Sequence, residues 1–378
     1  MDVAPVITPP YVAKPLRLVA FQALLLTSTR VGDPSSAKAF ARPYRGVSAR
    51  LREWEATGRV TRGDQPALYL HEYTTGGLTV RGLVGALAID RRAADLDDRA
   101  VWPHEGIHPE QVKELAVRMH AMGMNPAPIL LVHEGPAEAR ELLRRIATRV
   151  PDVEYVDRTE RQQRIWAITD PVEIEAINDA LAHSAALIAD GHHRYAAYLQ
   201  LQEENPGTPW DRGLAMLVDQ TDTPLFLGAV HRTFRGVTLA DVTAAALESG
   251  AAVETLPREE ALDSLGPATL VVTDAATWSV ITPRATYGPA LVSWLQTVLL
   301  PALAEHPPVV AFHHSADDAL SRAGARTVAA LLPAPDFRAV RDVVNRGGLL
   351  PEKATSFQPK PSLGVLMRSV HDEASAPH

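Results

Sequence analysis

Apolar and polar positions recur with two different periods along the chain, and each change of period marks a predicted element. Residues 67–90 alternate in polarity on both sides of a Thr-Thr-Gly-Gly turn, which predicts a β-hairpin. Between 112 and 119 four apolar residues recur at helical spacing, and Gly123 is the expected end of that helix, which starts near Pro109. The chain therefore changes from strand to helix near residue 109.

The same alternation of strands and helices continues beyond this first helix. Strands are predicted at 126–135 and 185–190, helices at 137–150 and 171–184, and a second hairpin at 153–169. Further strands and helices follow residue 207, without an internal repeat. Strands that alternate with helices favour a mixed α/β fold. Three segments are expected: a β-rich one at 1–100, one at 101–210, and a C-terminal α/β sub-domain at 211–378.

Composition narrows the class of protein. At 378 residues the chain is long enough for more than one core, and 46% hydrophobic with 22% charged residues is typical of a soluble globular protein. No apolar stretch reaches membrane-spanning length, and the N-terminus lacks a signal-peptide pattern, so a cytoplasmic protein without membrane contact is expected. Zero cysteines exclude disulfides and cysteine nucleophiles. A net charge of −8 disfavours nucleic acid as a partner.

The stretch Asp190, Gly191, His192, His193 and Arg194 lies where the apolar run 185–190 meets a helical pattern. Glycine permits a tight turn, and the first amides of a helix lack intrahelical acceptors. Together with the positive end of the helix dipole they form an anion site, to which an arginine adds donors suited to phosphate oxygens. The competing interpretation is that Asp190 caps the helix while His193 and Arg194 face solvent. The local pattern leaves both open.

The run "GHHRYAAYLQLQ" resembles the signature of the ParB/sulfiredoxin superfamily, in which such a turn holds nucleotide phosphates. The catalytic cysteine of sulfiredoxin falls at the position of His192, so sulfiredoxin chemistry is excluded here. A closer resemblance is to domain-of-unknown-function family 1015. It is carried by the segments "RGLVGAL", "PHEGIHPEQ", "NPAPILLV", "IADGHHRYAAYL", "VHRTF" and "EKATSFQPKP".

The resemblance implies a ParB/sulfiredoxin-like phosphate-binding unit at 101–210 and a nucleotide site at the turn. Related proteins with a comparable turn include free-serine kinases and ParB proteins that bind and hydrolyse CTP, so two uses of the site stay open. The chain departs from the family at Arg45, where an acid commonly follows the Pro-Tyr pair. An acidic role in that segment is therefore in doubt.

The motif "HEGIH" at 104–108 matches the letters of a zinc-protease motif, which functions only on a helix. Pro103, Gly106 and Pro109 disfavour that helix, so His104 and Glu105 are expected on a loop. From there Glu105 could reach a nucleotide-bound magnesium or take a proton from a hydroxyl. A surface loop with a capping role is the alternative.

Other polar residues are weaker candidates. His231 and Arg232 could add cationic contacts to a phosphate or form a structural ion pair. His71 and Glu72, on a predicted strand, are expected to face solvent. In "FHHSADDA" we interpret Ser315 as a helix N-cap rather than part of a metal site. A lysine between prolines, Lys360, is a conceivable phosphate ligand but is ordinarily just exposed.

These observations predict a nucleotide-dependent phosphotransferase acting on a small hydroxylated metabolite, perhaps serine-like, with ATP, ADP or CTP and Mg²⁺. The alternatives are a CTPase-like switch that acts through homodimerisation or a protein partner, and a site for a metabolite phosphate. Catalytic candidates are Asp190, Glu105 and His193, and metal-ligand candidates are Asp190 and Glu105. Candidate nucleotide contacts are Gly191, His192, His193, Arg194, His104, His231 and Arg232.

Overall fold

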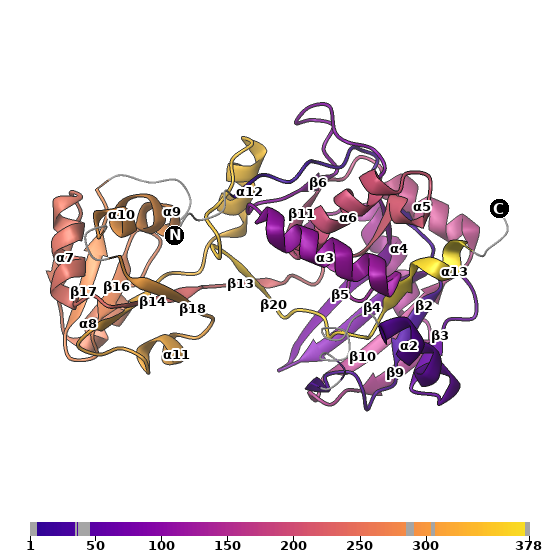
Figure 1. Cartoon of the computed structure of the whole chain (residues 1–378), viewed down its shortest axis with the longest axis horizontal. Coiled ribbons are helices and arrows are strands. Elements are labelled where there is room, and N and C mark those ends of the chain that lie inside the picture. Colours follow the sequence, from indigo (N-terminus) through magenta and orange to yellow (C-terminus); the bar gives the residue numbers. More distant parts are fainter. Residues whose placement is uncertain (1–5, 35, 37–45, 285–290, 304–306, 375–378) are drawn as a thin grey trace. The chain divides into compact units, whose positions relative to one another are not determined.

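The computed structural model describes residues 6–34, 36, 46–284, 291–303 and 307–374 (Figure 1). Arg45 lies outside these residues. Contacts within the chain divide it into two units, whereas the sequence suggested three consecutive segments. One unit comprises residues 1–103, 107–225 and 359–378, and the other comprises 104–106 and 226–358.

The first unit is built on a mixed nine-stranded sheet in the order β6-β11-β8-β12-β5-β4-β10-β9, with β1 also paired to β5. β5 is antiparallel to β4 and β12, whereas β8 runs parallel to β12. The strands are β1 (Leu18–Val19), β4 (Leu68–Thr75), β5 (Leu78–Ala88), β6 (Val101–Trp102), β8 (Ile129–His133), β9 (Val153–Val156), β10 (Gln162–Ile168), β11 (Ala186–Asp190) and β12 (Arg212–Asp219).

A smaller four-stranded sheet and several helices complete this unit. The small sheet has the order β3-β2-β21-β7, with β2 (Ala23–Leu26), β3 (Val60–Arg62), β7 (Met124–Asn125) and β21 (Met367–Ser369). The helices are α2 (Val47–Ala56), α3 (Pro109–Met122), α4 (Ala137–Ala147), α5 (Pro171–Leu181), α6 (His192–Glu204), η2 (Pro209–Asp211) and α13 (Val370–Ala374). Figure 1 shows α3 and α6 side by side, in agreement with their contacts.

The predicted local elements of this unit are confirmed. The first hairpin is β4 and β5, joined through Gly76 and Gly77, whose positive φ angles suit a tight turn. The second is β9 and β10. Helix α3 begins at Pro109, and Gly123 ends it in the left-handed conformation with φ 63°.

The second unit has a six-stranded antiparallel sheet in the order β15-β17-β16-β19-β14-β18 and a two-stranded ribbon, β13-β20. Its core includes Val271, Val280, Ala329 and Leu331, all buried. The strands are β13 (Phe226–Gly228), β14 (His231–Arg235), β15 (Ala252–Thr255), β16 (Leu270–Thr273), β17 (Trp278–Thr282), β18 (Val309–His313), β19 (Thr327–Leu331) and β20 (Ser356–Gln358). The helical segments are α7 (Leu239–Glu248), α8 (Arg258–Asp263), α9 (Leu291–Trp294), η3 (Leu295–Leu299), α10 (Leu300–Ala302), α11 (Ala316–Leu320) and α12 (Phe337–Asn345).

These sheets and helices confirm the predicted mixed α/β class. Within the described part of the chain, every helix is too short or too polar to cross a bilayer.

Candidate functional site

The turn at 190–194 joins the buried strand β11 to helix α6. The apolar residues of β11 are buried in the sheet, and the chain leaves it at Gly191, which has φ +95°. Only glycine adopts this left-handed conformation readily. A Cβ at this position would also lie 3.0–3.1 Å from the guanidinium of Arg194. Gly191 is the N-cap of α6, and no side chain forms a capping hydrogen bond there. Gly191 itself has no side chain that could accept from the first amides of the helix.

Asp190 forms ion pairs with two cations. Its Oδ2 lies 2.5 Å from Nη2 of Arg194, and its Oδ1 accepts a hydrogen bond from Nζ of Lys360. Arg194 also donates from Nη1 to the carbonyl of Pro128, at 2.5 Å. Two positive charges thus face one carboxylate at the start of α6. The side chains are 23% exposed for Arg194 and 43% for Lys360, so solvent reaches both cations.

The two histidines of the turn differ in their surroundings. His192 is buried. His193 accepts a hydrogen bond at Nε2 from the backbone N–H of His108, at 3.0 Å, and the two imidazole rings stack with centroids 5.8 Å apart. Since Nε2 acts as an acceptor, the ring carries its proton on Nδ1 in this arrangement. His108 is the N-cap of α3, so the contact joins the N-termini of α3 and α6.

His104 and Glu105 belong to the second unit. Nε2 of His104 lies 2.7 Å from the hydroxyl of Thr355, and its ring packs edge-on against Phe357. Burial raises the pKa of the Glu105 carboxyl to about 7, while the nearby Lys353 acts in the opposite direction. A carboxyl with this pKa exchanges a proton readily near neutral pH.

His231 and Arg232 are buried in the second unit. Burial lowers the pKa of Arg232 to about 10, with the negative charge of Glu105 opposing the shift. Its guanidinium donates to the carbonyls of Val230 and Lys353. Nδ1 of His231 accepts from the backbone N–H of Leu332, at 3.2 Å. Both side chains therefore have structural partners, and their contact with a phosphate stays a prediction.

The assignment of Asp190 and Glu105 as magnesium ligands stays a prediction. Both oxygens of Asp190 are engaged by Arg194 and Lys360, which repel a cation. Across the described ranges, no group of three or more His, Cys, Asp or Glu residues is placed to hold a metal ion. The "HEGIH" motif does not lie on helix α3, because this helix starts only after the motif, at Pro109.

The expectation that His71 and Glu72 face solvent is wrong. Both are 2% exposed, because β4 lies between β5 and β10 in the sheet. Glu72 is neutralised by ion pairs with Arg81 and Arg164, and His71 hydrogen-bonds to Gln163. Cross-strand pairing of this kind cannot be read from the alternation of one strand alone.

Sequence reasoning also undervalued Lys360. Nothing in the pattern around a lysine between prolines indicates a contact with a residue 170 positions earlier. In the described residues, Ser315 precedes α11 as expected, but its side chain makes no capping hydrogen bond. Asp318 of that helix lies 2.5 Å from Nδ1 of His313.

Comparison with known proteins gives distant structural likenesses. A free serine kinase variant in complex with AMP matches 78% of this chain and 94% of its own, with 17% identity and a TM-score of 0.43. SbnI with a C-terminal truncation, from Staphylococcus aureus, matches 78% and 90%, with 12% identity and a TM-score of 0.45. A conserved hypothetical protein from Pyrococcus furiosus matches 75% and 95%, with 16% identity and a TM-score of 0.38. TM-scores at this level are too low for a function to be carried over.

A comparison with curated proteins found no match. The family model described as protein of unknown function (DUF1015) matches residues 15–298, which is most of the chain and includes the turn at 190–194. The chain belongs to the DUF1015 family.

Proposed function

We propose that the chain is a nucleotide-dependent phosphotransferase that acts on a small hydroxylated metabolite. The observation that carries the proposal is the start of α6, where Arg194 and Lys360 lie beside the N-terminus of the helix. A phosphate group is the ligand that best matches a guanidinium, an ammonium and a helix N-terminus together. ATP, ADP or CTP would supply it, accompanied by Mg²⁺.

The charges at the turn also suggest how a phosphate binds. Asp190 now neutralises one of the two cations, so an incoming phosphate competes with this carboxylate for the same donors. A terminal phosphate carries more negative charge than one carboxylate and offers three oxygens. It can therefore bind Arg194 and Lys360 together while both cations stay in contact with solvent.

In the proposed reaction the hydroxyl oxygen of the metabolite forms a bond to the terminal phosphorus of the nucleotide. The bond from that phosphorus to its bridging oxygen breaks, and a base takes the hydroxyl proton. Glu105 has a pKa near 7, which suits such a base at neutral pH. Its assignment as the base stays a prediction, as does that of Asp190 or His193.

The first test is isothermal titration of the protein with ATP, ADP and CTP in the presence of Mg²⁺. We expect Arg194→Ala to weaken binding by about 10- to 100-fold, since a charge-assisted hydrogen bond contributes about 1.5–3 kcal/mol. Arg322→Ala is the matched control, because Arg322 is an exposed arginine of the second unit paired with Asp318. Failure of the wild-type chain to bind any of the three nucleotides would refute the proposal.

Asp190→Asn separates binding from turnover. Removal of the carboxylate frees both cations, so nucleotide affinity should rise by severalfold. If Asp190 also takes part in the reaction, turnover with a hydroxylated acceptor should fall at the same time. Weaker nucleotide binding in this variant would contradict the proposed competition.

The alternative is a nucleotide-binding switch that acts through homodimerisation or a protein partner. It predicts that ATP, ADP or CTP changes the molar mass measured by light scattering while no acceptor is phosphorylated. A phosphotransferase gives a phosphorylated product without requiring a change of mass.

A further inference from the structure

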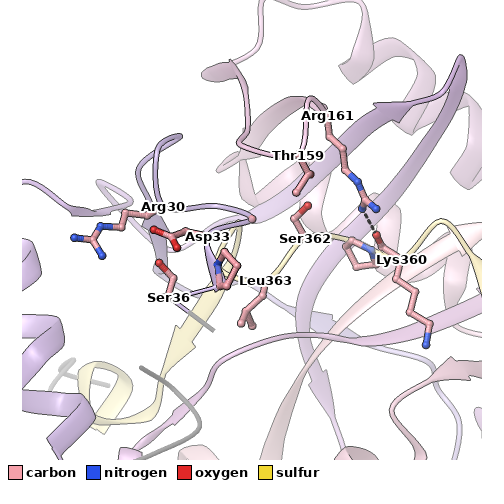
Figure 2. Close-up of a pocket in the computed structure, with 11 residues that line it drawn as sticks. Arg30, Asp33, Ser36, Thr159, Arg161, Lys360, Ser362 and Leu363 are labelled. Carbon is pink, nitrogen blue, oxygen red and sulfur yellow. Dashed lines mark hydrogen bonds between the residues drawn. The ribbon is translucent and has the colours of Figure 1, made fainter. Parts of the chain in front are cut away.

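A cavity lies in the first unit, within one side chain of the turn (Figure 2). Its volume is about 300 Å³, and its lining comes from three parts of the chain far apart in the sequence: residues 30, 32–34 and 36, residues 159 and 161, and residues 360–363. Figure 2 shows Asp33 and Ser36 on one side of the space and Thr159 and Ser362 on the other. Ligand pockets of this size lie at the lower end of the usual range of about 300–1,000 Å³. The cavity therefore suits a small molecule rather than a nucleotide.

The hydroxyl of Ser36 makes no hydrogen bond within the described part of the chain, although Ser36 is only 1% exposed. A buried hydroxyl without a partner costs about 1–3 kcal/mol, so native proteins rarely keep one without a reason. By contrast, the hydroxyls of Thr159 and Ser362 on the opposite side both donate to Asp157. Of these three hydroxyls, Ser36 alone thus still has its proton to donate to a ligand.

Lys360 connects this cavity to the turn. Its backbone lines the cavity, and its carbonyl accepts a hydrogen bond from Nη1 of Arg161 at 2.6 Å (Figure 2). Its ammonium binds Asp190. A molecule in the cavity would therefore lie one lysine side chain away from the phosphates proposed at the turn. In a transfer between two bound reactants the reacting atoms lie about 3–3.5 Å apart, so the acceptor would extend its hydroxyl from the cavity toward the turn.

The lining also indicates the chemistry of the molecule. Asp33 contributes a carboxylate that is 16% exposed and paired with Arg158 at 3.0 Å. Arg161 contributes a cation on the side of Thr159 and Ser362, whereas the guanidinium of Arg30 lies over the ring of Trp54 (Figure 2). Groups of both signs around a small space match a ligand that itself carries both an ammonium and a carboxylate.

We propose that this cavity binds the acceptor of the phosphoryl group, and that the acceptor is a small hydroxylated zwitterion. The inference rests on the proposed phosphotransferase function and adds to it the place and charge of the second substrate. Ser36 positions the acceptor by a hydrogen bond, and Asp33 faces its ammonium group.

The test is a ligand-observed NMR titration of the full chain with L-serine, ethanolamine and glycerol as probes. All three carry a hydroxyl group. L-Serine also carries a positive and a negative charge, ethanolamine carries one positive charge, and glycerol is uncharged. We expect L-serine to bind most tightly. Ser36→Ala should weaken its binding by about 3- to 10-fold, the equivalent of one neutral hydrogen bond. Ser321→Ala, which removes an exposed hydroxyl of the second unit, should leave it unchanged.

Misfolding does not confuse this test, because removal of an unsatisfied hydroxyl leaves stability unchanged or higher. Equal binding of L-serine to the wild type and Ser36→Ala, tighter binding of glycerol, or no binding of any probe would each overturn the inference. The titration needs no nucleotide, so its failure is distinct from that of the proposed function. Loss of nucleotide binding in Arg194→Ala with L-serine binding intact supports two separate subsites.

Discussion

At the scale of single residues, Gly191 determines the geometry of the turn through its backbone alone. With φ +95°, an alanine would lose about 1–2 kcal/mol from steric conflict with its own peptide. Its Cβ would also approach the guanidinium of Arg194 within 3.0–3.1 Å. We therefore expect Gly191→Ala to lower stability by that amount and nucleotide affinity by at least tenfold.

Gly76 provides the matched control for this substitution. It has φ +55°, and no described atom lies within 4 Å of the position that a Cβ would take there. Gly76→Ala should therefore show a similar loss of stability in urea denaturation but unchanged nucleotide binding in titration calorimetry. Equal loss of affinity in both variants would mean that backbone strain, rather than displacement of Arg194, is responsible.

Glu105 gives a pH dependence whose sign is fixed by its raised pKa. Well below pH 4.5 the carboxyl is protonated in both the folded and the unfolded chain, so it does not affect the free energy of unfolding there. Between pH 4.5 and about 7 the unfolded chain releases the proton first, so the free energy of unfolding falls as pH rises. The full effect is about 3 kcal/mol.

Glu105→Gln should remove this slope and leave the variant more stable than the wild type at pH 7 or above. Urea denaturation at pH 4.5, 6 and 7.5 measures it, with the exposed Glu248→Gln as the control. If the wild type and Glu105→Gln differ equally at all three pH values, Glu105 ionises with its ordinary pKa in the folded chain.

At the scale of elements, the strand, turn and helix at 185–204 follow from local sequence. The buried run of β11, the glycine and the helical spacing of α6 each have a short-range signal, and all three are confirmed. No short-range signal in the sequence indicates which residues contact α6. Tyr195 accepts a hydrogen bond from the N–H of Val12 and donates to the carbonyl of Pro10, more than 180 positions earlier. Long-range contacts of this kind depend on the assembled sheet.

Tyr195→Phe tests how firmly this contact fixes the N-terminal segment to α6. The side chain is 0% exposed, so removal of its hydroxyl leaves the buried N–H of Val12 without this acceptor. We expect a loss of about 1–3 kcal/mol in chemical denaturation and faster hydrogen exchange at Val12.

Tyr11→Phe is the control, since it keeps the ring that packs against the guanidinium of Arg99. It should change stability by less than about 0.5 kcal/mol. An equally small effect of Tyr195→Phe would show that water replaces its hydroxyl.

At the scale of the whole molecule, the C-terminal residues 359–378 belong to the first unit although 226–358 form the second. They bring Lys360 to the turn and β21 into the small sheet, between β2 and β7. The sequence predicts further strands after residue 207 but not the partners of β21, because these partners, residues 23–24 and 124–125, lie far away along the chain. The candidate site was therefore only partly predictable.

Arg368 of β21 offers a test of what this return of the chain contributes to stability. It is 0% exposed and donates to Asn125, to the carbonyls of Pro209 and Arg212, and to Glu373. Arg368→Met keeps much of the side-chain volume but leaves these acceptors without their donor. Breaking a buried ion pair from one side costs about 3–5 kcal/mol.

We expect that loss in the free energy of unfolding, with faster hydrogen exchange concentrated in β2, β7 and β21. The exposed Arg322→Met, which breaks a surface ion pair, should cost no more than about 1 kcal/mol. Because Arg368 and Lys360 lie on the same returning segment, Arg368→Met should also weaken nucleotide binding if the segment must be docked for Lys360 to reach the turn. Loss of stability with full nucleotide affinity would show that the segment 359–363 is held in place independently of β21, through the contacts of Tyr73 and Arg161 with its backbone carbonyls.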